Sequence, residues 1–96
     1  MTVRITCINK AGGYHEDPHE VVTHYGWLNE GTNEANKADR QSMVNWVKQG
    51  NFAYVKDIYG DVAYCFVNKS RNGTEFLQTH RDNIPTDNLL KLPECI

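Results

Sequence analysis

The chain has 96 residues and a formal charge of −2, from ten Lys or Arg and twelve Asp or Glu residues. This length predicts one domain with a modest hydrophobic core, and it is short for an enzyme that must also enclose a substrate. Charges of both signs are mixed along the chain. No strong electrostatic field is therefore expected to attract nucleic acid or an anionic membrane.

The chain carries no recognisable targeting or membrane-spanning pattern. Residues 1–10 contain no apolar run of the length that a signal peptide needs, and no later window approaches the roughly 18 apolar residues of a membrane span. The three cysteines, Cys7, Cys65 and Cys95, are widely spaced and form no C-x-x-C pair. This usage is typical neither of a secreted disulfide framework nor of a zinc ribbon, so we expect reduced thiols and a cytoplasmic protein.

The first half of the chain predicts two strands separated by loops. Residues 3–9 alternate between two faces and are rich in β-branched side chains, as is typical of a strand. Residues 10–19 contain two adjacent glycines and an X-Pro step, which predict a polar loop. A second strand is expected over residues 20–27. The almost wholly polar residues 28–38 predict a second loop.

A helix is expected at about residues 40–49. Asp39 is a suitable N-cap, and Gly50 stands where a helix C-terminus favours a left-handed residue. Between them, apolar residues recur at spacings of three and four, which places them on one side of a helix. They are Met43, Val44, Trp46 and Val47.

Three further strands are expected, beginning near Phe52, Asp61 and Thr74. Asn72-Gly73 predicts a type I′ hairpin turn before the last strand, in which both central residues need positive φ. The expected fold is therefore α+β, a single small domain over residues 1–96 in the order ββαβββ. One helix packs on a mainly antiparallel sheet.

The turns also predict which side chains share a face of this sheet, because side chains alternate along a strand. A turn centred on Tyr59 pairs Tyr54 with Tyr64. The face so formed carries Phe52, Tyr54, Tyr64, Phe66, Leu77 and Thr79, and the opposite face carries Ala53, Val55, Ala63, Cys65, Val67 and Phe76. Both faces are apolar and one helix covers only one of them, so we expect another segment to cover the aromatic face. Core packing is favoured over base stacking, since base-stacking platforms lie in basic grooves.

Residues 15–19, HEDPH, match the H-E-x-x-H pattern of zinc proteases. That pattern needs a helix, and Pro18 disfavours the helical conformation at the preceding residue. The extended protease pattern would also place Gly and His where this chain has Val22 and Tyr25. We interpret the match as a false positive. Residues 14–20 are expected to be non-helical, without a tetrahedral zinc ion and without a catalytic role.

A less regular metal or small-ligand site in the loop 14–24 stays open as an alternative. It would use His15, His19 or His24 together with a cysteine, although no ligand spacing here is diagnostic. Cys65 lies in the apolar run VAYCFV, where a buried and unreactive thiol is expected rather than a nucleophile. No cofactor is expected.

The chain resembles the small prokaryotic family known as domain of unknown function 3892, over nearly its whole length. The resemblance rests on VRITCINK, PHE, the helix end VKQG and the tail DNLLKLPEC. In the tail it covers Asp87, Asn88, Leu89, Leu90, Leu92, Pro93 and Cys95, and Cys7 matches the cysteine of the first strand. Phe76 and Gln78 depart mildly from the family pattern. The resemblance implies no activity, cofactor or partner, but it implies that Cys7 and Cys95 lie close together.

The tail is also expected to have a structural role. Leu89, Leu90 and Leu92 follow a turn, and burying each would contribute roughly 1.5 to 3 kcal/mol. We therefore expect residues 86–96 to fold back onto the sheet and bury at least two leucines, with the aromatic face as the candidate surface. The alternatives are a tail that docks on a partner and an aromatic face that forms a homodimer.

The function favoured by the sequence is that of a small non-catalytic interaction domain, acting through a loop surface or an uncovered part of its sheet. The partner is an unknown protein or a second copy of the chain. No membrane is expected, and nucleic acid is disfavoured. The alternative is a metal-ion or small-ligand binding module that uses the His-rich loop, and an enzyme ranks third.

Overall fold

The structure, a computed structural model, describes residues 1–11, 22–81, 84–86 and 88–95. The predicted α+β class, the single α-helix and the order ββαβββ are confirmed, and two further strands are present. Within the described residues the elements are β1 (Thr2–Lys10), β2 (Val22–Asn29), β3 (Glu34–Asp39), α1 (Arg40–Lys48), β4 (Phe52–Lys56), β5 (Val62–Lys69), β6 (Glu75–Arg81), β7 (Ile84–Thr86) and the 3-10 helix η2 (Asn88–Lys91).

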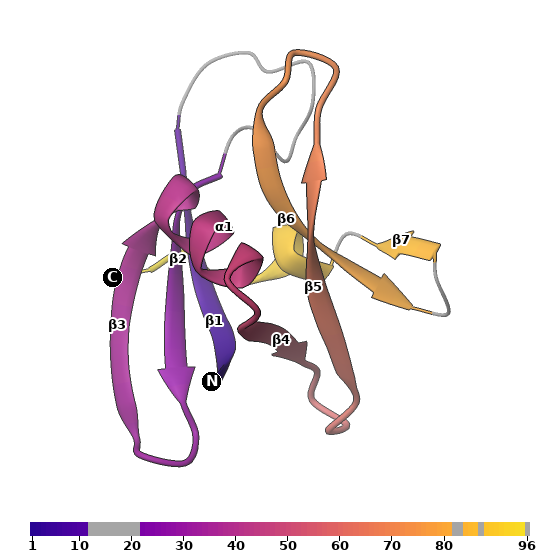
Figure 1. Cartoon of the computed structure of the whole chain (residues 1–96). Helices are drawn as coiled ribbons and strands as arrows, with labels where there is room; N and C mark the ends of the chain where they lie inside the picture. Colours follow the sequence, from indigo (N-terminus) through magenta and orange to yellow (C-terminus); the bar gives the residue numbers. More distant parts are fainter. Residues whose placement is uncertain (12–21, 82–83, 87, 96) are drawn as a thin grey trace.

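The strands follow one another in the order β3-β2-β1-β4-β5-β6-β7. Neighbours are antiparallel, except that β4 runs parallel to β1. Figure 1 shows α1 in the angle between the β1–β3 side and the β5–β6 side of the sheet, where it contacts both. No helix in the described part of the chain has the length and apolar character that crossing a membrane requires.

The helix begins as predicted. The Asp39 carboxylate accepts a hydrogen bond from the Ser42 backbone N–H at 2.7 Å, which satisfies one of the unpaired donors of the first turn. This bond holds the pKa of the Asp39 carboxyl below its ordinary value. At the other end Gly50 has a φ of 100°, the left-handed conformation that a helix terminus favours.

The core lies between α1 and the face of the sheet that α1 covers, which we call the inner face. Met43 and Val44 of the helix enter it, and Leu89 of the tail joins the same cluster. Tyr25 is its largest fully buried side chain, and its hydroxyl accepts a hydrogen bond from the Leu77 backbone N–H. The remaining core residues are Val3, Ile5, Ile8, Val22, Ala53, Val55, Cys65 and Leu77.

The loop predicted over residues 28–38 is wrong for its second half, because residues 34–39 form the edge strand β3. Asn29 pairs with Glu34, and the Asn29 side-chain oxygen accepts hydrogen bonds from the backbone N–H groups of Gly31 and Thr32. Asn33 then adopts a φ of 65°, which asparagine tolerates better than most residues. Turn chemistry, rather than apolar alternation, therefore produces this hairpin.

The type I′ turn predicted at Asn72-Gly73 is also wrong. Gly73 has a φ of 86° but Asn72 is not among the residues with positive φ, and the Gly73 N–H donates to the Ser70 carbonyl. The loop spans residues 70–74, since Lys69 pairs with Glu75. This is a type I turn followed by a left-handed glycine, and it changes the expected register by one residue.

This shift exchanges the faces of β6. Leu77 pairs with Val67 and Thr79 pairs with Cys65, so both lie on the inner face and are fully buried. The prediction that they lie beside the aromatic residues is wrong, as is the prediction that Phe76 lies with Val67. The prediction that Tyr54 pairs with Tyr64 is confirmed.

A bulge in β1 interrupts the expected strict alternation of residues 3–9. The register with β2 shifts between Ile5 and Cys7, after which Ile8 is buried on the same side as Ile5. Cys7 consequently pairs with Gly26 on the face opposite the core. That position brings Cys7 within reach of the tail.

The tail folds back onto the domain, as predicted. Ile8 donates its backbone N–H to the Pro93 carbonyl and accepts from the Cys95 N–H, both at 3.0 Å. Leu89 is 1% exposed, and Leu90 and Leu92 are partly buried against the same cluster. The expected location on the aromatic face is wrong, because Leu89 packs with the inner-face core.

Candidate functional site

The feature of the structure that stands out as a candidate site is a group of four aromatic side chains on the outer face of β4 and β5. They are Phe52, Tyr54, Tyr64 and Phe66, and we call them the aromatic strip. The exposed fraction is 58% for Phe52, 47% for Tyr64 and 53% for Phe66, and Tyr54 is half-buried. The prediction that another segment covers this face is therefore wrong.

Three rings of the strip contact one another, and the fourth contacts a histidine. Tyr64 lies at the centre, with its ring centroid 6.2 Å from that of Phe52 in an edge-to-face arrangement and 6.1 Å from that of Tyr54. Phe66 in turn contacts the His80 ring edge-to-face at 5.0 Å. These separations are typical of favourable aromatic pairs, so each ring of the strip is oriented by a neighbouring ring.

Charged groups of both signs border the strip at Tyr54. The Tyr54 hydroxyl donates a hydrogen bond to Glu30, and the Lys56 ammonium lies 3.9 Å from the same carboxylate. Arg4 is the neighbour of Tyr54 across the parallel β1–β4 pair, and its Nε atom is buried without a hydrogen-bond partner among the described residues. The border is therefore mixed in charge rather than basic.

The hydrogen bond between Tyr54 and Glu30 shifts the pKa values of both groups. Desolvation and this bond to a carboxylate raise the pKa of Tyr54 to about 12. The same bond is the main cause that lowers the pKa of Glu30. At neutral pH the phenol is thus a proton donor and Glu30 is an anion, and neither is tuned for proton transfer.

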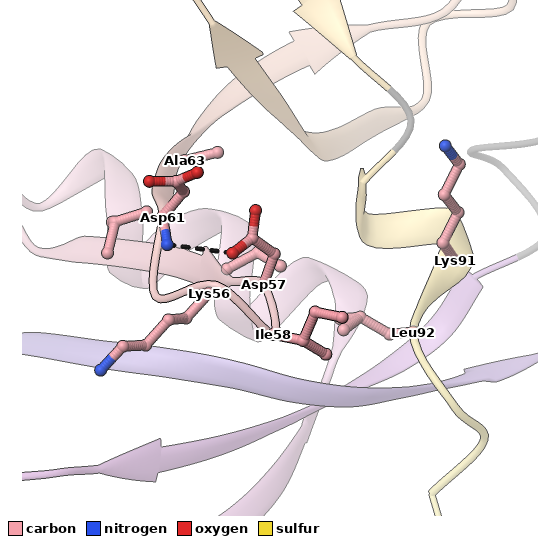
Figure 2. Close-up of a pocket in the computed structure, with 9 residues that line it drawn as sticks. Lys56, Asp57, Ile58, Asp61, Ala63, Lys91 and Leu92 are labelled. Atoms are coloured by element: carbon pink, nitrogen blue, oxygen red, sulfur yellow. Dashed lines mark hydrogen bonds between the residues drawn. The ribbon is translucent and has the colours of Figure 1, made fainter.

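A separate pocket of about 580 Å³ opens between the β4–β5 hairpin and the tail (Figure 2). Apolar side chains including Val55, Ala63 and Leu92 line it, and Lys56 and Lys91 stand among its charged residues. The Asp57 Oδ1 atom accepts hydrogen bonds from the Tyr59 and Asp61 backbone N–H groups, so this oxygen is engaged within the hairpin loop. The charged side chains do not converge on one point in Figure 2.

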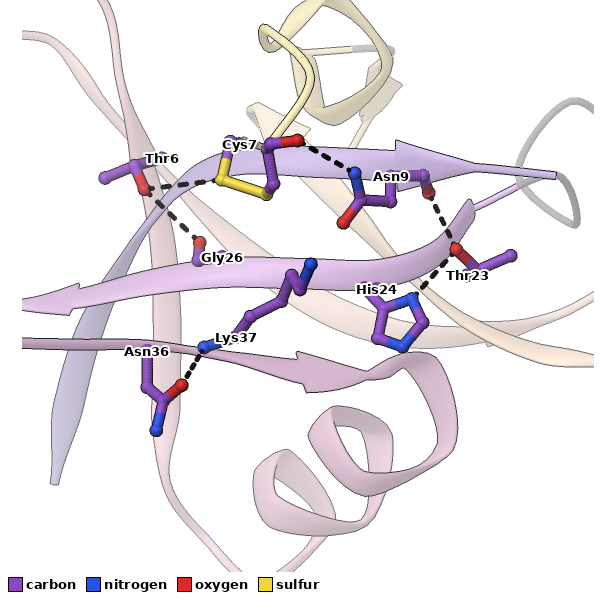
Figure 3. Close-up of a disulfide and its surroundings, with 9 residues drawn as sticks. Thr6, Cys7, Asn9, Thr23, His24, Gly26, Asn36 and Lys37 are labelled. Atoms are coloured by element: carbon purple, nitrogen blue, oxygen red, sulfur yellow. Dashed lines mark hydrogen bonds between the residues drawn. A yellow bond between two sulfur atoms is a disulfide. The ribbon is translucent and has the colours of Figure 1, made fainter.

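Cys7 and Cys95 form a disulfide, which confirms that these residues lie close together (Figure 3). The expectation that all thiols are reduced is wrong for this pair. The bond spans 88 residues, and Asn9 adds a side-chain hydrogen bond to the Cys95 carbonyl. The spacing of the cysteines does not reveal this pairing, because it depends on the tail returning to β1, whereas the family resemblance indicated that the two residues lie close together.

The third cysteine has no environment that would activate it. Cys65 is buried on the inner face, and desolvation raises the pKa of its thiol to about 12. A nucleophilic cysteine instead needs an accessible thiol with a lowered pKa. The structure thus places Cys65 in the core, in agreement with the sequence prediction of a buried thiol.

Of the three histidines predicted as candidate ligands, the structure describes His24. His15 and His19, the H-E-x-x-H match and the predicted non-helical segment 14–20 lie outside the described residues. His24 is half-buried on β2, with its Nδ1 atom 3.0 Å from the Thr23 hydroxyl. No group of three His, Cys, Asp or Glu side chains suited to a metal ion occurs among the described residues. Metal binding in this loop stays a prediction.

The remaining predicted site residues belong to the tail. Leu89, Leu90 and Leu92 pack against the core, and Pro93 contributes the carbonyl that pairs with Ile8. Asn88 opens η2, and Asp87 lies outside the described residues.

The sequence predicts that the four residues of the aromatic strip share one face of the sheet, but it places that face in the interior.

Comparison with known proteins gives a family but no named relative. The model of a family described as "Protein of unknown function (DUF3892)" matches residues 4–93, which is most of the chain. No curated protein and no solved structure shows significant similarity.

Proposed function

The chain belongs to the DUF3892 family of proteins of unknown function, and we propose that it acts as a small non-catalytic interaction domain that binds its partner through the aromatic strip. The observation that carries this proposal is the exposure of about half of each of three aromatic rings on one sheet face. Contiguous apolar patches of this kind on small proteins commonly mark binding surfaces.

The composition of the strip supports a protein-binding role. Tyr and Phe are enriched in the cores of interfaces, where their large and rigid rings are buried with little loss of conformational entropy. Tyr64 is held by two ring contacts, so its orientation is set before a partner arrives. Preorganisation of this sort lowers the entropic cost of association.

The proposal is tested by capturing partners from an extract of the native host on immobilised protein. A Tyr64→Ser/Phe66→Ser variant should lose a partner that the unmodified protein retains. The matched control is Ile58→Ser/Tyr59→Ser, which removes two even more exposed side chains, 91% and 84%, from the tip of the β4–β5 hairpin outside the strip. Equal recovery of every bound protein by the strip variant would contradict the proposal.

The alternative is a metal-ion or small-ligand binding module in the loop 14–24, with His15, His19 or His24 and a cysteine as the candidate metal ligands. It predicts that zinc raises the melting temperature and that a chelator removes the increase, because a ligand that binds only the folded state stabilises it. The His24→Ala variant should then lose most of the effect. An interaction domain without a metal site would show the same melting temperature in buffer alone, with zinc and with the chelator.

A further inference from the structure

The area of the aromatic strip, the charges around it and its position in the sheet indicate what kind of partner it binds. We propose that this partner is a second copy of the same chain, so that two molecules associate face to face through their strips. This inference rests on the proposed function, since it uses the same surface, but it specifies who the partner is.

The exposed area of the aromatic strip is large enough for the apolar centre of such an interface. A Phe or Tyr side chain has roughly 150 to 250 Å² available for burial, so the exposed parts of Phe52, Tyr64 and Phe66 together offer about 300 Å². A stable interface buries about 800 Å² on each partner. The strip therefore supplies an apolar centre of a little over a third of that area. The polar and charged residues around it would supply the rim.

Val62 extends this centre toward the hairpin tip. It is 47% exposed, and it alternates with Tyr64 and Phe66 along β5, which places it on the same face. At the other end Asn68 continues the row, and its side chain is already hydrogen-bonded to Gln78. The apolar centre thus runs along three successive outward positions of one strand and ends at a polar pair.

The charge around the strip distinguishes a second copy from a nucleic acid. A surface for single-stranded nucleic acid combines stacking rings with an excess of basic groups. Here Glu30 lies between the strip and Lys56, and the whole chain has a charge of −2. The anionic carboxylate would repel a phosphate backbone close to Tyr54.

The same mixed charge favours self-association. A surface that meets its own copy brings like charges together unless both signs are present, because a twofold interface is made by the same patch on both molecules. Arg4 and Lys56 of one copy can approach Glu30 of the other. Such mixed-sign contacts at a rim favour correct pairing more than they add affinity.

The geometry of the sheet permits the contact. The strip lies on the outer face of β4 and β5, and α1 packs on the inner face through Met43 and Val44. Two sheets that pack face to face lie about 10 Å apart, with side chains from both filling the space between them. The dimer would therefore be a sandwich in which each strip covers the other.

The test is the mass of the purified protein in solution, measured by sedimentation equilibrium over a range of concentrations. The unmodified chain should sediment as a dimer, and Tyr64→Glu should weaken the dimer at least tenfold because it buries a charge at the centre. The matched control is Tyr59→Glu, since Tyr59 is 84% exposed at the hairpin tip outside the strip, and it should leave the mass unchanged. Circular dichroism of each variant establishes that it is folded.

The possible results separate the two proposals. An unmodified chain that is monomeric at all concentrations, or a folded Tyr64→Glu variant that dimerises normally, overturns self-association. If the strip variant nevertheless loses a host partner, the proposed function stands with another partner. A labelled single-stranded oligonucleotide that binds the monomer and not Tyr64→Glu would replace the second copy with nucleic acid. If neither mass nor capture depends on the strip, both proposals fail.

Discussion

At the scale of single residues, Gly26 shows how one missing side chain makes room for a covalent link. A Cβ atom placed on Gly26 would lie 2.2 Å from the Cys7 sulfur and 2.8 Å from the Cys95 sulfur. Real Cβ atoms are not found at such distances, so an alanine there would push the disulfide away from β2. The glycine is needed for space, and its backbone conformation plays no part.

We predict that Gly26→Ala destabilises the oxidised protein by about 1 to 3 kcal/mol, the usual cost of overpacking. In a Cys7→Ala/Cys95→Ala background the same change should be neutral or slightly stabilising, because glycine within a strand otherwise weakens it. Chemical denaturation of the four proteins gives the coupling between the sites. An equal cost in both backgrounds would show that something other than the sulfur atoms crowds Gly26.

Asp39 provides a second residue-scale prediction, on the pH dependence of stability. Its pKa is lowered in the folded state by the hydrogen bond from Ser42, so its contribution is present above the pKa of the unfolded chain and is lost as the pH falls through the folded pKa. Asp39→Ala should therefore lower the melting temperature by a few degrees at pH 7, and by much less at pH 2 to 3.

The control for this prediction is Asp39→Asn. Asparagine also caps helices but does not titrate in this range, so its melting temperature relative to that of Asp39→Ala should not depend on pH. A difference between the aspartate and alanine proteins that stays constant down to pH 2 would argue against a charged cap.

At the scale of elements, the two hairpin loops of β4–β6 are versions of one motif. Residues 57–61, DIYGD, and 70–74, SRNGT, both have a glycine at the fourth position, with φ of 87° and 86°. In both, the glycine N–H donates to the carbonyl of the first residue. The side chain of that first residue, Asp57 or Ser70, accepts from the last backbone N–H.

This motif explains how much of the sheet could be predicted. Treating residues 57–61 as an odd-numbered loop gave the correct pairing of Tyr54 with Tyr64. Reading Asn72-Gly73 as a two-residue turn gave the wrong face for β6, because a register change of one residue exchanges the faces of a strand. Comparison of the two loops would have revealed the shared spacing of Asp57 and Gly60 with Ser70 and Gly73.

Other parts of the fold cannot be predicted from the local pattern of apolar and polar residues. β3 has almost no buried side chain, so alternation could not reveal it, and only the Asn29 and Asn33 turn chemistry indicates a hairpin. Whether the aromatic strip lies inside or outside could not be predicted either. It depends on where the tail leucines pack, and Leu89 packs in the inner-face core. The helix and its cap, in contrast, were local enough to be predicted.

The loop motif predicts that Gly73→Ala costs about 1 kcal/mol or somewhat more, through the strain of an L-residue at positive φ. No atom lies within 4 Å of the added methyl group, so crowding should not contribute. Gly73→Asn should cost less than half as much, because asparagine tolerates this conformation. Thermal unfolding of the two variants provides the comparison, and equal losses would point to a lost contact instead of backbone strain.

At the scale of the whole molecule, the radius of gyration of the Cα atoms is 12.6 Å, close to the value of about 12.5 Å expected for a compact domain of this length. The tail is part of this compact body. Leu89 shares the core with Met43 and Val44, although it lies more than forty residues further along the chain.

We therefore predict that deleting residues 86–96 abolishes cooperative unfolding, whereas Leu89→Ala alone lowers the stability by about 2 to 5 kcal/mol. The deletion removes Leu89, the backbone bonds to Ile8 and the disulfide together. Circular dichroism during urea titration distinguishes the outcomes. A truncated chain that still unfolds in one sharp transition would show that the tail is a docking segment and not part of the core.

The disulfide between Cys7 and Cys95 also closes residues 7–95 into a covalent ring. Cutting a ring once opens it but does not divide it. A protease that cleaves one exposed hairpin, such as residues 57–61, would therefore leave a single species in a non-reducing gel, and two fragments would separate only after reduction. The chain could likewise be given new ends in that hairpin, with its original ends still joined through sulfur.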